Sequence, residues 1–176
     1  MWGASEIAAM ATELAERPAA QNARGTVRQG SAPWRSRFWQ RAPGTADLER
    51  QAKQAHWNVK GPNFIALHEL FDKVAEAAEE FTDLLAERAT ALGGIAEGRL
   101  QVVAGHSTLP PYPNEIVAER EHVDVLSTAL AVFGKAAREA IDEAARFGDA
   151  DTADVFTEIS RETDKQLWLV ETHLHG

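Results

Sequence analysis

Two pairs of potential metal ligands lie on one expected helix near the middle of the sequence. His68 and Asp72 are four residues apart, and so are Asp83 and Glu87. Residues four apart lie on the same face of an α-helix, and the eleven residues from Asp72 to Asp83 complete nearly three turns. Imidazole and carboxylate groups together suit a divalent transition metal such as iron, manganese or zinc. The alternative is a solvated helix face with ordinary charges.

The separation of the two pairs limits how they can act. At 1.5 Å per residue, Asp72 and Asp83 are roughly 16 Å apart along the helix axis. Metal–ligand bonds are about 2 Å long, so both pairs cannot bind one ion within one subunit. Either each pair is a half-site, or a two-fold partner places its Asp83 and Glu87 against this chain's His68 and Asp72.

These residues require two helices joined by a short turn. Gly61-Pro62 ends the first helix, which runs from Ala46 to Val59, and Asn63 can cap the second. His56 lies near the end of the first helix, so it approaches the start of the second across the turn. The second helix is indicated by apolar residues at every third or fourth position: Phe64, Leu67, Phe71, Val74, Ala78, Phe81, Leu85 and Leu92.

Two more amphipathic helices follow a long connection. Glycines and the Pro110–Pro113 stretch mark a crossover that is too long for a hairpin and has room for a short helix. The third helix opens at Pro113 or Asn114 and ends at Gly148, and Asp149 or Asp151 caps the fourth. Their apolar positions are Ile116, Val123, Leu126, Leu130, Phe133, Ala137, Ile141 and Ala144, then Phe156, Ile159, Thr163, Leu167, Val170 and Leu174. The sequence predicts an all-α, ferritin-like four-helix bundle with its long crossover between helices two and three.

Composition restricts the chemistry and the compartment. The 176 residues suit one domain, and 44% of them are hydrophobic. The chain has no cysteine, so histidines and carboxylates are left to bind a metal. No apolar run is long enough to span a membrane, and Glu6, Glu13 and Glu16 interrupt the first apolar stretch, so we expect a cytoplasmic protein.

The N-terminal segment has a different composition. Residues 1–45 carry six Arg and three Glu, a net charge of +3, and the remainder carries −12, which together give the −9 of the whole chain. Residues 17–43 contain arginine, glycine and proline but no acid, which is typical of a flexible basic arm. One interpretation is a divergent arm that binds DNA; the other is a coding sequence that is out of frame here. We therefore divide the chain into an atypical, poorly ordered arm (1–45) and a helical domain (46–176).

The residues around the ligand pairs resemble a known family. Lys53-Gln54-Ala55-His56-Trp57-Asn58-Val59-Lys60-Gly61, followed by Phe64, Leu67, His68, Phe71 and Asp72, is similar to the signature of the Dps family of bacterial mini-ferritins. Asp83, Glu87, Arg88 and Leu92-Gly93-Gly94 continue the resemblance, as does the run from Asp151 to Glu171. The similarity covers roughly residues 46 to 174.

The resemblance implies a function and a role for each residue. It implies a hollow dodecamer that oxidises Fe²⁺ with hydrogen peroxide, stores ferric oxide and so protects DNA from oxidative damage. The iron ligands would be His56, His68 and Asp72 of one chain with Asp83 and Glu87 of its partner. Trp57 would lie beside the iron and accept oxidising equivalents, unless it packs in the core.

The resemblance also implies that the start of the fourth helix faces a three-fold axis. Asp151 and Asp154 would line a cation pore there, because a ring of carboxylates attracts Fe²⁺. The alternative function is that of a DNA-compacting structural protein, associated with the nucleoid, with impaired or no ferroxidase activity.

Three other features have simpler interpretations. Glu119 and His122 form one Glu-x-x-His pair, the motif that larger di-iron bundles use twice, but no second pair is present. We interpret this pair as a solvated helix face. Trp168 is expected to pack against the bundle, and Lys53 either holds a nearby carboxylate or is solvated.

Overall fold

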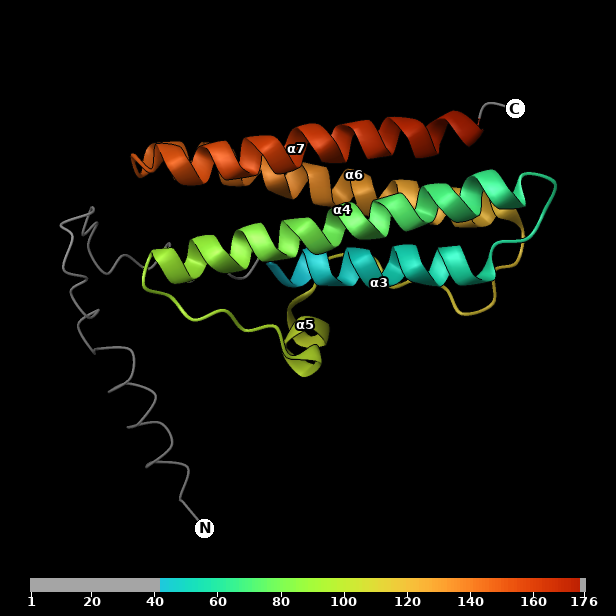
Figure 1. Ribbon diagram of the computed structural model, residues 1–176, viewed down its shortest axis with the longest axis horizontal. Coiled ribbons are helices and arrows are strands. Elements are labelled where there is room, and N and C mark those ends of the chain that lie inside the picture. Colours follow the sequence, from blue (N-terminus) through green and yellow to red (C-terminus); the bar gives the residue numbers. More distant parts are fainter. Residues whose placement is uncertain (1–41, 175–176) are drawn as a thin grey trace, which may run out of the picture.

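The computed structural model describes residues 42–174, and over this range the chain forms a four-helix bundle (Figure 1). The long helices are α3 (Ala42–Asn58), α4 (Phe64–Ala91), α6 (Glu119–Arg146) and α7 (Ala150–Glu171). A short helix, α5 (Leu100–His106), lies within the connection from α4 to α6, and a 3₁₀ turn, η1 (Thr172–Leu174), follows α7. The predicted all-α architecture and its long crossover are confirmed. Residues 1–41, which include most of the predicted basic arm, lie outside the described range.

The bundle consists of two antiparallel helix pairs. α3 packs along α4, α6 packs along α7, and α5 lies against α3 (Figure 1). α3 begins four residues before the predicted start, but its 17 residues still span only about 26 Å, against about 42 Å for the 28 residues of α4. Within residues 42–174, α3 therefore covers only part of the length of α4.

The predicted apolar stripes form the core. Fully or almost fully buried side chains come from all four long helices: Leu48 and Ala52 from α3, Leu67, Phe71 and Val74 from α4, Leu126 and Leu130 from α6, and Phe156, Ile159 and Val170 from α7. Each such side chain contributes on the order of 1.5–3 kcal/mol through its burial. Trp168 is an exception, because 65% of its surface is exposed, and the expectation that it packs against the bundle is wrong for this chain.

The helix ends follow the expected residues, with two differences. Gly148, with φ +71°, ends α6, and Asp149 caps α7 by accepting a hydrogen bond from the Thr152 N–H. The third long helix, however, begins at Glu119 rather than at Pro113 or Asn114, because the residue before it, Ala118, still has an extended backbone. Asn63 occupies the residue before α4, but its side chain makes no capping hydrogen bond.

The crossover lies along α3. The Gln51 side chain donates to the Pro110 carbonyl at 2.9 Å, Ser107 donates to Asp47, and Val103 of α5 is buried. None of the helices within residues 42–174 is long and apolar enough to cross a membrane. The crossover thus passes beside the helix that carries Lys53 and His56.

Candidate metal centre

The turn between α3 and α4 brings His56 and His68 together. α3 ends at Asn58, α4 begins at Phe64, and the Phe64 N–H donates to the Gly61 carbonyl at 3.2 Å. Gly61 has φ +154°, a backbone conformation that a residue with a side chain rarely adopts. The two histidines are twelve residues apart in the chain, yet their ring centroids are 3.6 Å apart and the rings are stacked at 21°.

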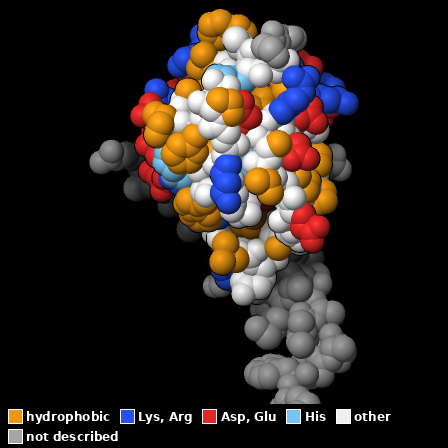
Figure 2. All heavy atoms as spheres, turned by 90° about the vertical axis from the view of Figure 1, so that its right-hand side faces the viewer, with side chains coloured by type: hydrophobic (Ala, Val, Ile, Leu, Met, Phe, Trp, Pro, Cys, Tyr) orange, Lys and Arg blue, Asp and Glu red, His pale blue; other side chains and the backbone are white. Residues whose placement is uncertain are grey.

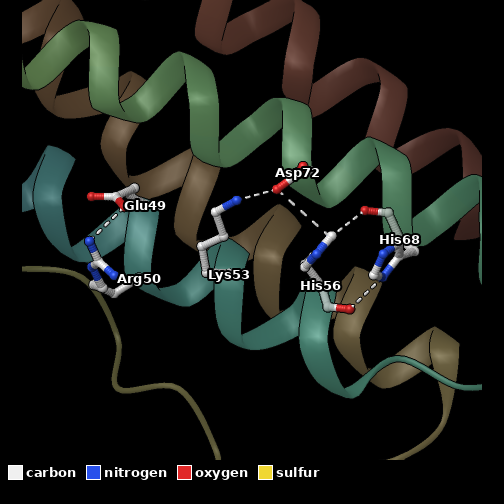
Figure 3. A network of polar contacts seen from close by, with 6 residues as sticks. All are labelled: Glu49, Arg50, Lys53, His56, His68 and Asp72. Carbon is white, nitrogen blue, oxygen red and sulfur yellow. Dashed lines mark hydrogen bonds and ion pairs between the residues drawn. The ribbon is translucent and has the colours of Figure 1, made fainter.

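Each histidine fixes the orientation of the other. The Nδ1 of His56 is 2.7 Å from the His68 carbonyl oxygen, and the Nδ1 of His68 is 2.9 Å from the His56 carbonyl oxygen (Figure 3). A carbonyl oxygen can only accept, so each Nδ1 carries the hydrogen and each Nε2 keeps a lone pair. Metal-ligating histidines are normally oriented in this way by a hydrogen bond from their second nitrogen. Both rings are therefore in the tautomer that binds metal through Nε2.

Asp72 lies one turn after His68 and is held by Lys53. The Lys53 ammonium donates to Asp72 Oδ1, and the same oxygen is 3.9 Å from His56 Nδ1 (Figure 3). The hydrogen bond from Lys53 lowers the pKa of the Asp72 carboxyl; burial opposes this shift, and the charge of Lys53 and the neighbouring histidines add to it. Asp72 is therefore ionised at neutral pH, as a metal ligand must be. Lys53 holds a carboxylate, which was one of the two expected roles.

The second predicted pair lies elsewhere on α4. Asp83 and Glu87 are exposed and lie about three and four turns, respectively, beyond Asp72 along the same helix. Within residues 42–174, no three histidine or carboxylate side chains converge where they could hold a metal ion. The chain therefore carries two separate sets of ligand-type side chains, and the donor chemistry of His56, His68 and Asp72 fits a divalent transition metal.

Trp57, the residue after His56, lies at the surface. Its side chain is 63% exposed, so packing in the core of this chain is excluded. Figure 2 shows hydrophobic side chains spread over this end of the bundle, and exposed residues at the start of α4 and before α6 include Phe64, Ile65 and Val117. Trp57 is therefore placed where a ligand or another subunit could reach it.

The three aspartates at the start of α7 differ in their surroundings. Asp149 is buried, and it accepts hydrogen bonds from the Thr152 hydroxyl at 2.7 Å and from Arg88 Nη2 at 2.8 Å. Burial raises the pKa of Asp149, but the hydrogen bonds from Thr152 and the charge of Arg88 outweigh it and lower the pKa overall. Asp151 and Asp154 are exposed. Capping thus occupies Asp149, and the two residues predicted to line a pore stay at the surface.

The Glu119–His122 pair is not a solvated helix face, contrary to our interpretation of the sequence. His122 is fully buried, and its Nδ1 is 2.5 Å from the Tyr112 hydroxyl. Burial lowers the pKa of His122 and raises that of Tyr112, so the imidazole is neutral at neutral pH. Glu119 turns the other way and accepts hydrogen bonds from Asn63. The two side chains therefore serve different parts of the fold and do not form half of a di-iron site.

Sequence reasoning missed the partners of these residues. The sequence alone assigned no contact to Arg88 or Tyr112. Arg88 donates a hydrogen bond to Asp149, which is 61 residues later in the chain. Tyr112 is hydrogen-bonded to His122 from the loop before α6. Helical periodicity gives the face on which a residue lies, and it carries no signal for a partner in a distant segment.

The sequence of this chain is similar to those of known proteins. Residues 46–176 match the family described as ferritin-like domain. The DNA protection during starvation protein of Agrobacterium fabrum is 44% identical over 128 residues, which are 73% of this chain and 79% of that protein.

Solved structures give the same picture. The Dps of Microbacterium arborescens in its high iron form is 31% identical, with a TM-score of 0.74 over 81% of this chain and 93% of that one. The Dps of Staphylococcus aureus is 28% identical, with a TM-score of 0.75 over 80% and 93% of the two chains.

Proposed function

This chain belongs to the ferritin-like family and to its Dps group, and from that premise we propose that it is a ferroxidase that sequesters iron. It oxidises Fe²⁺ with hydrogen peroxide and stores ferric oxide inside a hollow homo-oligomer, a dodecamer built from two-fold dimers. Removal of both iron and peroxide protects DNA. The Agrobacterium fabrum relative is named for DNA protection during starvation, and one related structure is of a high iron form.

The observation that carries the proposal is the reciprocal pair of hydrogen bonds between His56 and His68. It leaves an Nε2 lone pair on each of the two stacked imidazoles, and His56 is itself 3.9 Å from the ionised Asp72 through its Nδ1. These are donor types that suit Fe²⁺, but within the described residues of one chain no three of them converge around an ion. Asp83 and Glu87 are an exposed pair that lacks histidines. In a two-fold dimer, Asp83 and Glu87 of each chain would complete the histidine and Asp72 set of the other, because an isologous interface repeats every contact twice.

The redox step balances without another reductant or oxidant. Two Fe²⁺ ions give one electron each to one hydrogen peroxide molecule, whose O–O bond breaks while two protons are taken up to give two water molecules. Because both electrons are delivered at one site, no hydroxyl radical is released. The exposed Trp57 at the edge of the cluster would supply an electron whenever only one Fe²⁺ is bound.

Iron would enter through carboxylates at the start of α7. Asp151 and Asp154 are exposed on its first turns, and a ring of such residues around a three-fold axis would concentrate Fe²⁺. DNA, if it binds, would contact the arginines of residues 17–43, because the remainder of the chain is strongly acidic.

The proposal is tested by adding limited peroxide to anaerobic protein with excess Fe²⁺. We expect about two Fe²⁺ oxidised per peroxide, with little hydroxyl radical in a spin-trap assay, and loss of most of the activity in His56→Ala. The alternative function, DNA compaction without ferroxidase activity, predicts DNA retardation in gels and Fe²⁺ oxidation no faster than in buffer. That result would contradict the proposal.

A further inference from the structure

The start of α4, which precedes His68 and Asp72, is held from outside by α6. Glu119 Oε2 accepts a hydrogen bond from the Asn63 backbone N–H at 3.1 Å, and Glu119 Oε1 accepts one from Asn63 Nδ2 at 2.8 Å. Asn63 itself does not cap α4. The carboxylate of Glu119 therefore accepts from the N–H of the residue before α4, which is the hydrogen bond that the acidic residue of a capping box normally makes, and it lies near the positive end of the helix dipole.

The turn is shaped around this carboxylate. A Cβ atom on Gly61 would collide with the Glu119 carboxylate, so the glycine permits the close approach. One residue earlier, Lys60 forms an isolated bridge with Ala118, directly before Glu119. The turn is thus fixed to the start of α6 at three nearby points. We refer to Gly61, Asn63 and Glu119 together as the α4 latch.

The α4 latch is connected to the histidine pair through the first turn of α4. The Asn63 carbonyl accepts a hydrogen bond from the Leu67 N–H at 3.0 Å, and His68 is the next residue. The Phe64 ring lies 5.1 Å from the His68 ring. His68 can stack on His56 only while the start of α4 keeps its position relative to the end of α3, and the latch fixes that position.

We propose that Glu119 is a positioning residue for the metal site. Its carboxylate holds the start of α4 so that the His56 and His68 rings remain stacked and their Nε2 atoms keep the orientation that binds metal. This inference rests on the metal site proposed above. Residues that orient the ligands of a metal commonly change its affinity by about 10–100-fold when they are removed.

Cobalt(II) binding to the full-length assembled protein tests this role, because its absorption bands report ligand geometry without turnover. We expect Glu119→Ala to bind Co²⁺ about tenfold more weakly and with altered bands. Asp124→Ala, which removes an exposed carboxylate from the same helix, is the matched control and should bind as wild type does. Glu119→Gln should retain most of the affinity, because its Oε1 can accept from the Asn63 N–H while its Nε2 donates to Asn63 Oδ1 after the Asn63 amide turns over.

Two results would overturn the inference. If Glu119→Ala is less stable to heat but, while folded, binds Co²⁺ with wild-type affinity and bands, Glu119 is only structural. If the wild-type protein itself binds no Co²⁺, the metal site fails first and the positioning role fails with it.

A second variant keeps the test decisive if Glu119→Ala does not assemble. Asn63→Ala removes the Nδ2 donor and leaves the backbone hydrogen bond to Glu119 in place. We expect a smaller loss of Co²⁺ affinity in the same direction, with altered bands. Unchanged affinity and bands in Asn63→Ala would overturn the positioning role.

Discussion

The rings of His56 and His68 stack 3.6 Å apart, and each Nδ1 is hydrogen-bonded to the backbone carbonyl of the other residue. This reciprocity joins the last turn of α3 to the first turns of α4. It also determines which nitrogen each ring offers to a metal. The proposed function depends on this relationship more than on any single ligand.

Iron entry predicts an effect of surface charge at the start of α7. Replacing Asp151 and Asp154 with Asn removes two charges and leaves the buried Asp149 cap intact. Iron uptake at low Fe²⁺ should slow several-fold while assembly is unchanged, because the local Fe²⁺ concentration falls. Stopped-flow absorbance of ferric product measures the rate. Glu139→Gln with Glu158→Gln removes the same charge from exposed positions on α6 and α7, and an equal slowing in that control would remove the pore assignment.

Asp149 predicts an acid-dependent loss of stability. Its pKa is lowered in the folded protein, so its stabilising contribution is present above the ordinary pKa of 3.8 and is lost as the pH falls through the lower folded value. Asp149→Ala should lower the free energy of unfolding by about 1–3 kcal/mol at pH 7, because it removes the cap and leaves Arg88 without this partner. Urea unfolding at pH 7 and at pH 3 measures both effects. A deficit that is the same size at the two pH values would contradict the assigned pKa shift.

Because His122 is buried, we expect the free energy of unfolding to depend on pH at milder acidity as well. Its pKa is lowered by burial, so the folded state binds fewer protons than the unfolded state, and stability falls as the pH drops below the ordinary value of 6.5. The slope is at most about 1.4 kcal/mol per pH unit. His122→Asn, which can still accept a hydrogen bond from Tyr112, should show less of this slope. Comparison of unfolding at pH 7.5 and 5.5 isolates the contribution of His122, and identical slopes in the two proteins would exclude it.

The basic segment predicts where DNA binds. A protein that begins at Thr45 should lose its DNA affinity, because residues 46–176 carry a net charge of −12 and repel phosphate. Gel retardation at several salt concentrations measures this, and binding of the full-length chain should weaken steeply as salt increases. Equal retardation of the truncated and full-length proteins at the same salt would place DNA binding elsewhere. If the segment is out of frame, the gene should contain a compensating frame that encodes an apolar-periodic helix before Ala46.

The sequence predicts those features that depend on local pattern. The stripe through Leu67, Phe71 and Val74 is buried as expected, since a 3.6-residue period determines the face of a helix. The proximity of His56 and His68 followed from a short turn between two helices. Their reciprocal hydrogen bonds did not, because they depend on the angle at which α4 leaves the turn.

The errors arose where a distant segment decides the environment. Glu119 and His122 lie on one helix, yet their surroundings differ. Glu119 is hydrogen-bonded to Asn63 at the start of α4, and the buried His122 is hydrogen-bonded to Tyr112. The start of α6 was placed too early because Ala118 is still extended and is bridged to Lys60, a partner that periodicity does not reveal. Trp168 directly follows Leu167 but lies outside the three- or four-residue spacing of the α7 stripe, and it is exposed.

The central claim is that each metal site is shared by two chains, and mixing two inactive variants tests it most directly. His68→Ala and Glu87→Ala should each lose most of the ferroxidase activity. In a mixed dimer, one site carries both lesions, and the other combines an intact His56, His68 and Asp72 set with an intact Asp83 and Glu87 pair. With random mixing, half of the dimers are mixed and half of their sites are intact, so about a quarter of the wild-type activity should return.

The control is a mixture of wild type with the His68→Ala/Glu87→Ala double variant. Its mixed dimers have two sites with one lesion each, so they should add no activity beyond that of the wild-type dimers. Recovery of about a quarter in the first mixture, with none beyond wild-type dimers in the second, is the predicted result. No recovery in dimers that are shown to be mixed and assembled would contradict the shared site and would require a metal centre within one subunit.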